Sequence, residues 1–183
     1  MGSKCVFLWD RSRLPWDHGD AEIGDLREAA AEIIDCHCEP SDQVIIYGEV
    51  ARIEPNGDPR SSDPYFGANL QHALLLAGEV LAKDSAPVRV VVVASVPPCA
   101  HLLEEGNPFF SWPPSAETFE VTRGAADAVR TRAPIHAVAL SPITGRELLV
   151  SSLGECGLEP EWTCSSAGEM AHLALLLEDW RST

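Results

Sequence analysis

Positive charge is scarce in this sequence. Lys and Arg together make up 13 of its 183 residues, against 28 Asp and Glu, so the formal net charge is −15. Nucleic acids and anionic membranes are bound mainly through Lys and Arg, so this balance argues against both as partners. The excess of acidic residues either keeps the protein soluble or steers it toward a basic surface on a partner.

Long apolar runs and phosphate-binding motifs are missing as well. No run reaches the ~18 apolar residues that a membrane-spanning helix needs, and Met1–Lys4 has no apolar signal core, so we expect a cytoplasmic protein. The sequence has no Gly-x-x-x-x-Gly-Lys phosphate loop and no Gly-x-Ser-x-Gly nucleophile elbow. Six cysteines are too few for a disulfide scaffold of this length, which predicts reduced thiols.

Apolar strands and amphipathic helices alternate along the chain. Strands are predicted at 4–8, 43–47, 50–53, 88–94, 135–140 and 159–163. Helices are predicted at 20–35, 69–83, 116–131 and 144–155, and from 166 onward. This alternation predicts βαβ units with right-handed crossovers. We therefore expect a single α/β domain over residues 1–183, with a doubly wound, Rossmann-like sheet. The sheet should be six-stranded and mostly parallel, with one short antiparallel edge strand and helices on both faces.

Three stretches between or within these elements carry further predictions. Residues 55–64 form a proline-rich loop that is longer than a connection needs, so it is either mobile or functional. Residues 95–114 are expected to be irregular. Ser166 and Glu169 have the Ser-x-x-Glu spacing of a helix capping box.

Asp10 and Ser12 follow the first apolar run. In an open α/β sheet, ligands bind at the carboxyl ends of the strands, so this Asp-x-Ser is the first candidate site. One hypothesis is a Mg²⁺-dependent hydrolase or phosphotransferase that uses Asp10. Phosphoryl-accepting sites of the haloacid-dehalogenase type begin in this way, but they have a second aspartate where this chain has Ser12.

Three stretches resemble motifs of the von Willebrand factor type A (vWA) domain family. Residues 10–13, Asp-Arg-Ser-Arg, stand where that family has Asp-x-Ser-x-Ser. Residues 67–70, Gly-Ala-Asn-Leu, are similar to the family's Gly-Thr-Asn-Leu helix opening. The strand at 91–94 is followed by Ser95, where the family has Thr-Asp-Gly. The resemblance covers nearly the whole chain and implies the same doubly wound fold.

In the vWA family these three loops jointly bind one divalent cation through hydroxyl and carboxylate oxygens, which suit Mg²⁺. Asp10 and Ser12 match that pattern, whereas Arg13, Ala68 and Ser95 stand in place of a serine, a threonine and an aspartate. The resemblance therefore implies a degenerate site with Asp10 and Ser12 as its remnants, no bound metal and no other cofactor.

Arg13 is the strongest reason for this expectation. A fixed positive charge within ~4 Å of a cation costs on the order of several kcal/mol in a protein environment. Arg13 could instead pair with Asp10 and take the place of the ion. The alternative is weak Mg²⁺ binding, with additional oxygens from water or from Asp17, Asp20 or Glu49.

The pairs Cys36/Cys38 and Cys99/His101 raise the alternative of a zinc site. The first helix starts near the carboxyl end of the first strand and runs roughly 24 Å along the sheet. It should therefore place Cys36 and Cys38 at the opposite pole from Cys99 and His101. We expect these thiols to be packing residues rather than metal ligands.

An aromatic, proline-rich stretch follows the longest β-branched strand. Phe109, Phe110 and Trp112 lie between prolines and are expected at the same end of the sheet as Asp10, beside Trp16. Aromatic side chains on a stiff loop lose little entropy on binding and make good anchors for a partner. The alternative is that they fold back as a lid over the ends of helices.

These observations favour a non-catalytic adaptor or scaffold domain that binds another protein. The resemblance implies two kinds of partner, an AAA+ ATPase of the MoxR type or a large multi-subunit assembly. The chain could also be an interaction domain of a longer polypeptide. The residues expected to bind the partner are Asp10, Ser12, Arg13, Trp16, Asn69, Ser95, Phe109, Phe110 and Trp112.

Overall fold

The computed structural model describes residues 3–13, 21–55, 57, 65–83, 86–142 and 145–182. Within them a six-stranded sheet has the strand order β10-β9-β6-β1-β3-β4. Its strands are β1 (Lys4–Asp10), β3 (Gln43–Tyr47), β4 (Ala51–Glu54), β6 (Val88–Ala94), β9 (Ile135–Leu140) and β10 (Trp162–Cys164). Neighbouring strands of this sheet pair in parallel, except that β3 and β4 pair antiparallel at one edge. The predicted sheet, with its short antiparallel edge strand, is confirmed.

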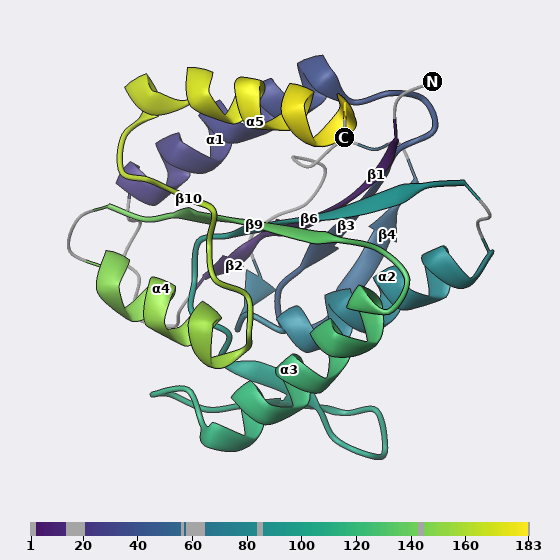
Figure 1. Ribbon diagram of the computed structural model, residues 1–183. Helices are drawn as coiled ribbons and strands as arrows, with labels where there is room; N and C mark the ends of the chain where they lie inside the picture. Colours follow the sequence, from purple (N-terminus) through teal and green to yellow (C-terminus); the bar gives the residue numbers. More distant parts are fainter. Residues whose placement is uncertain are drawn as a thin grey trace.

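Helices cover both faces of the sheet (Figure 1). On one face lie α1 (Ala21–His37) and α5 (Ala171–Ser182), and on the other α2 (Leu70–Lys83), α3 (Ala116–Arg130) and α4 (Arg146–Glu155). Alternate side chains of β1 enter the two cores, with Leu8 on the side of α2 and Phe7 and Trp9 on the side of α1. A strand that is buried on both faces has no polar side, which is why β1 is apolar between Lys4 and Asp10 and β6 is apolar apart from Arg89.

Sequence periodicity located most of these elements. β3, β6 and β9 have the predicted bounds, and α1 to α4 begin and end within two residues of theirs. No helix in the described part of the chain is long and apolar enough to cross a bilayer. Of the loop at 55–64, only residues 55 and 57 are described, so its predicted role lies outside the described residues.

The predicted capping box at Ser166 is wrong. Residues Ala167–Glu169 form a short 3₁₀ helix, η1, and α5 begins only at Ala171. In a capping box, the backbone N–H of Glu169 would donate to the Ser166 hydroxyl. Here it donates to the backbone carbonyl of Ser166 at 3.1 Å. The Glu169 carboxylate accepts a hydrogen bond from the backbone N–H of Ser165.

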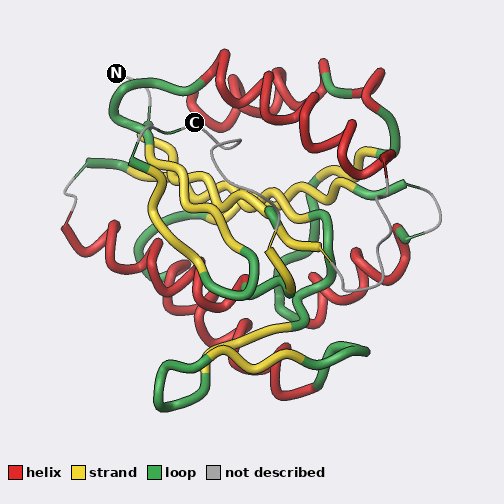
Figure 2. Tube along the Cα trace, turned by 180° about the vertical axis from the view of Figure 1, so that it is seen from behind, coloured by secondary structure: helices red, strands yellow, loops and turns green. Residues whose placement is uncertain are grey.

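Two small sheets were not predicted. β7 (Ala100–Leu102) and β8 (Pro108–Phe110) form an antiparallel hairpin inside the stretch that was expected to be irregular. β2 (Ser12–Arg13) pairs in parallel with β5 (Tyr65–Phe66). Figure 2 shows the hairpin apart from the central sheet, at the bottom of the view. Strands of two or three residues are too short for an alternating pattern to reveal them.

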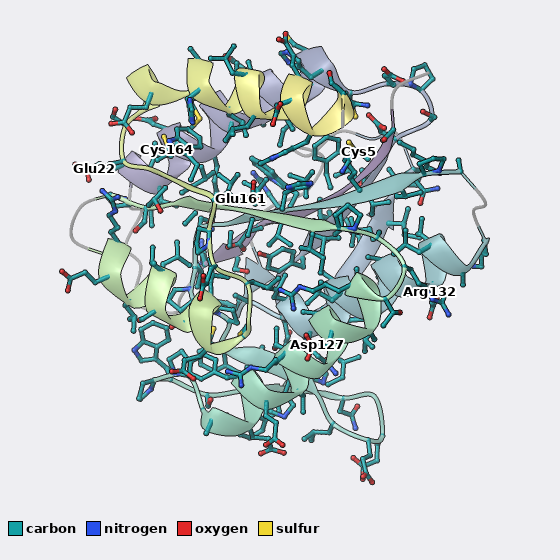
Figure 3. All side chains as sticks on the ribbon, in the orientation of Figure 1. Cys5, Glu22, Asp127, Arg132, Glu161 and Cys164 are labelled. Carbon is teal, nitrogen blue, oxygen red and sulfur yellow. The ribbon has the colours of Figure 1, made fainter. Side chains whose placement is uncertain are left out.

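Buried polar contacts connect β1, α5 and the segment before β3 at the pole of the molecule opposite the carboxyl ends of the strands. The guanidinium of Arg181 on α5 pairs with Asp42, whose Oδ1 accepts a hydrogen bond from the backbone N–H of Cys5 at 2.7 Å. Figure 3 shows Cys5 at this end of the molecule and Glu22 and Cys164 at the other. Strand β1, helix α5 and the segment before β3 therefore meet here.

All six cysteines are free thiols. Cys36 and Cys38 flank His37, whose backbone carbonyl accepts a hydrogen bond from Arg181 at 2.8 Å at the pole of Cys5. The Sγ of Cys99 accepts a hydrogen bond from the backbone N–H of Ala68 near the carboxyl ends of the strands. The predicted separation of the two cysteine groups is confirmed. Burial raises the pKa of Cys5 and Cys38 to about 11 and that of Cys99 to about 12, as expected of packing thiols. Cys36 is exposed, so the expectation that it is a packing residue is wrong.

Candidate functional site

The strand order reverses between β1 and β6. From β1 the chain moves to β3 and β4 on one side, and from β6 it moves to β9 and β10 on the other. In open α/β sheets such a switch point leaves a crevice at the carboxyl ends of the strands, where ligands bind. Asp10 ends β1 and Ser95 follows β6, so the two residues flank this crevice.

The carboxylate of Asp10 is buried and held by four hydrogen-bond donors. Oδ2 accepts from the backbone N–H of Ser95 at 2.7 Å, the Ser95 hydroxyl at 2.9 Å and the backbone N–H of Val96 at 2.8 Å. Oδ1 accepts from the backbone N–H of Ser12 at 2.8 Å. These bonds offset the hydration that the carboxylate loses on burial. They also link the end of β1 to the end of β6.

Arg27 of α1 brings a positive charge to the same place. Its Nη2 lies 3.9 Å from Asp10 Oδ1, and its side chain is only 9% exposed. Nη2 also donates to the backbone carbonyl of Ser12 at 2.5 Å, and Nε donates to the hydroxyl of Ser95 at 2.7 Å. The guanidinium thus contacts Asp10, Ser12 and Ser95. We call these three residues together with Arg27 the strand-end cluster.

The hypothesis that Arg13 pairs with Asp10 is wrong, because Arg27 has that position. Arg13 is exposed, and its guanidinium carbon lies 5.2 Å from the centroid of the Phe66 ring. Strand β2 carries Arg13 away from the crevice, since it pairs with β5. The signal for Arg27 was present in the sequence: it stands four residues before Ala31 and seven before Ile34, on the apolar stripe of its helix.

Two buried hydroxyl groups, one in the cluster and one beside it, have no hydrogen-bond partner among the described residues. They are the hydroxyls of Ser12 and Tyr47. Tyr47 is the register partner of Asp10 on β3. Burial, together with the nearby charge of Asp10, raises the pKa of the Tyr47 hydroxyl, which therefore stays neutral.

The described residues do not fit the divalent cation that the vWA resemblance implies, and Asp17 and Asp20, named above as additional ligands, lie outside the described part of the chain. Such an ion needs several oxygen ligands with net negative charge around them. Here the Ser95 hydroxyl already donates to Asp10 and accepts from Arg27, and Ala68 offers no side-chain oxygen. The guanidinium of Arg27 lies within ion-pair distance of the only carboxylate in the cluster.

Asn69 has a structural position. Its Oδ1 accepts a hydrogen bond from the backbone N–H of His72 at 2.9 Å, which is the geometry of an N-cap at the start of α2. Its Nδ2 donates to the backbone carbonyl of Glu49 at 2.9 Å. The side chain is buried and ties the β3–β4 turn to the helix.

The end of the molecule at the carboxyl ends of the strands, which we call the crown, carries exposed aromatic side chains beside the exposed Arg13. Phe66 is 49% exposed and Phe110 is 36% exposed. Gly67 has a positive φ of 72°, and a Cβ there would come 3.2 Å from Cδ2 of Phe110. The Phe110 ring therefore rests on the glycine that directly follows Phe66. We call Arg13, Phe66 and Phe110 the crown patch; sequence reasoning missed Phe66, because a two-residue strand left no pattern around it.

The remaining aromatic residues that were predicted to bind the partner differ in their exposure. Phe109 is exposed but packs beside His101, with ring centroids 5.2 Å apart. Trp112 is partly buried and packs against the core under α2 and α3, as the lid alternative expects. Trp16 lies outside the described residues. Of the nine predicted binding residues, the structure thus leaves Arg13, Phe109 and Phe110 on the surface.

Solved structures with this fold come from several kinds of protein. The vWF domain of the type V pili tip protein Mfa5 from Porphyromonas gingivalis has a TM-score of 0.64 at 9% identity, covering 99% of this chain and 97% of that one. The pilus adhesin SpaC from Lactobacillus rhamnosus GG has a TM-score of 0.61 at 14% identity. The human COPII-coat protein Sec24c has a TM-score of 0.57 at 7% identity.

Coverage differs between these structures. The alignment spans 98% of this chain in both SpaC and Sec24c, but only 31% and 32% of those longer chains. At these identities the likeness shows the fold alone. No curated protein matches the sequence.

A match to a family model identifies the family of this chain. The model described as "Rv0959-like protein, vWA domain" matches residues 41–154, which is more than half of the chain. Those residues run from the segment before β3 to α4 and include the helix opening at Asn69 and the strand end at Ser95. The chain therefore belongs to the Rv0959-like family of vWA domains.

Proposed function

We propose that this vWA domain is a non-catalytic adaptor or scaffold that binds another protein through the crown patch. The observation that carries the proposal is the pair of exposed phenylalanines, Phe66, which directly precedes Gly67, and Phe110, whose ring packs against Gly67. Exposed aromatic rings on a stiff backbone are frequent anchors of protein interfaces. Structures of the same fold include a pilus adhesin and a coat protein, which supports a binding role.

The partner should present an apolar pocket with a basic rim. Glu49 is exposed, and its Cα lies 3.8 Å from a Cβ built on Gly67. Glu104 and Glu105 are exposed on the loop between β7 and β8, and the whole chain has a net charge of −15. Opposite charge on the partner would raise the association rate and exclude acidic competitors. An AAA+ ATPase or a subunit of a large assembly could present such a surface.

The proposal includes the cytoplasm as the compartment. Its support is that six cysteines are present as free thiols, among them the exposed Cys36. A reducing compartment keeps such thiols unpaired.

The position of Asp10 supports a non-catalytic role. A carboxylate that attacks phosphorus needs an accessible oxygen, but Asp10 is 2% exposed and both of its oxygens accept hydrogen bonds. Attack would require breaking these bonds and displacing Arg27. We therefore do not propose the hydrolase or phosphotransferase that Asp10 suggested at first.

The test is affinity capture from cells of the source organism, followed by mass spectrometry. The baits are the wild-type chain, the double variant Phe66→Ser/Phe110→Ser, and Leu175→Ser as the matched control. Leu175 is an apolar residue of α5 and is 62% exposed. It belongs to the layer of α1 and α5, away from the crown patch. Wild type and Leu175→Ser should capture the same proteins.

The double variant should lose those proteins while its melting temperature stays close to that of the wild type, because both rings are substantially exposed. Capture should also survive chelation of divalent cations. Equal capture by all three baits would contradict the proposed surface.

A further inference from the structure

We infer that Arg27 is the resident cation of the strand-end cluster, and that its removal uncovers a site for Mg²⁺ or Mn²⁺. In this inference the guanidinium balances the charge of Asp10 from within the chain. It concerns the isolated domain and does not depend on the partner proposed above.

The contacts of Arg27 are those of a bound ion rather than of a surface side chain. One guanidinium reaches the Asp10 carboxylate, the Ser12 carbonyl and the Ser95 hydroxyl, which come from the ends of two strands. A planar fork of donors suits several oxygens at fixed positions. The side chain is 9% exposed, so these contacts are shielded from water and salt.

The position of Arg27 on its helix also matters. It lies on the buried face of α1, next to Leu26 and before Ala30, in a helix that packs on the sheet. A buried arginine is rare unless its charge is paired. Asp10 is the partner that makes this burial tolerable, and Arg27 in turn makes the burial of Asp10 tolerable.

The cluster contains an oxygen that nothing uses. The Ser12 hydroxyl is fully buried and has no hydrogen-bond partner among the described residues. The backbone N–H of the same residue bonds to Asp10, and its carbonyl bonds to Arg27. Without the guanidinium, the Ser12 hydroxyl, Asp10 Oδ1 and the Ser95 hydroxyl are left as oxygen donors around one buried negative charge. That donor set suits a hard cation.

The experiment measures cation binding by the purified chain and three variants. Arg27→Gln removes the charge and keeps a side-chain donor, so it retains the shape of the cluster. Asp10→Asn/Arg27→Gln removes the carboxylate as well. Arg123→Gln is the matched control, because Arg123 is an exposed arginine that contacts Glu155. Readouts are the electron paramagnetic resonance signal of free Mn²⁺ and the melting temperature with chelator or with about 10 mM Mn²⁺.

Arg27→Gln should bind one Mn²⁺ per chain and gain at least about 3 °C in melting temperature from it. Wild type, Arg123→Gln and the double variant should leave the free Mn²⁺ signal unchanged and shift by less than about 1 °C. Binding of Mn²⁺ by the wild type would overturn the inference. So would a folded Arg27→Gln variant that binds none.

Two further points keep the outcome clear. If Arg27→Gln does not fold, the wild-type titration still decides whether the cluster accepts a cation beside the guanidinium. Because no partner is present in this experiment, its failure leaves the capture result untouched, and failure of capture leaves the cation result untouched.

Discussion

At the scale of single residues, the account depends on the pair Asp10 and Arg27. Their charges face each other at 3.9 Å in a place where both side chains are less than a tenth exposed. Removal of one partner from such a pair leaves an uncompensated buried charge, which is costly, whereas removal of both leaves none. The pair is therefore expected to behave as a unit.

Arg27→Ala should lower the free energy of unfolding by about 3 kcal/mol, because Asp10 loses its counter-charge in a buried site. Asp10→Asn should be destabilising as well. The double variant should cost less than the sum of the two by at least about 1 kcal/mol. Urea denaturation of the four proteins measures this coupling. Strict additivity would show that the two charges do not interact.

Sequence reasoning found half of this pair. Asp10 was found because an acidic residue at the end of an apolar run marks a strand end. The cation was assigned to Arg13, because Arg13 stands in the same short motif. Position in a motif says little about where a side chain points after a strand ends, and here a second strand, β2, begins two residues after Asp10 and pairs with β5. The burial of Arg27 could have been predicted from its place on the apolar stripe of the first helix.

At the scale of elements, long strands and helices were predictable and short ones were not. A run such as Val88–Ala94 is apolar at every position except Arg89, because both faces of β6 are covered. The hairpin of β7 and β8 contains a proline and a histidine within its three-residue strands, so composition alone suggested a loop. Its two strands are defined by pairing with each other and by the packing of β7 on α2 and α3. Leu102, for example, donates its backbone N–H to Gln71 of α2 at 3.0 Å.

Gly67→Ala tests how this hairpin is seated. The positive φ of Gly67 strains any L side chain, and a Cβ there would lie only 3.2 Å from Phe110 and 3.3 Å from Ala100, so the variant should lose about 1–3 kcal/mol and shift Phe110. Gly124→Ala in α3 is the matched control, because a Cβ there meets nothing within 4 Å. It should leave stability unchanged or raise it by up to about 1 kcal/mol. Thermal unfolding measures both, and equal effects would show that Gly67 is not a packing constraint.

At the scale of the whole molecule, two cores on either side of one sheet explain why most of the cysteines are inert. Burial raises the pKa of Cys99 and Cys156 to about 12, from about 9 in an open environment. Both thiols belong to the core on the side of α2, α3 and α4. They are neutral packing groups at physiological pH, and the protein keeps its fold without disulfides.

The pH dependence of stability follows with a definite sign. A thiol whose pKa is higher in the folded state favours the folded protein fully below pH 9, and this contribution is lost as the pH rises from 9 to 12. Each of the two thiols should remove up to about 1.4 kcal/mol of unfolding free energy per pH unit in that window. Cys99→Ala/Cys156→Ala should flatten the decline relative to the wild type. Identical slopes would contradict the burial of these thiols.

The two ends of the sheet also differ in the side chains that they expose. The pole at Asp42 and Arg181 is closed by buried polar contacts, whereas the crown carries a closed polar cluster beneath exposed aromatic rings. The doubly wound fold and its short antiparallel edge strand were predictable from periodicity. The division of the crown into a buried charge pair and an exposed apolar patch was not, since it depends on how β2, β5 and the hairpin meet.

The most direct test is the affinity of the captured partner for the isolated domain, measured by biolayer interferometry in chelator and in Mg²⁺. We predict a Kd that is the same in both buffers and that Phe66→Ser/Phe110→Ser weakens by about 100-fold or more. A Kd that the chelator raises strongly, or that the double variant leaves unchanged, would contradict metal-independent binding through the crown patch.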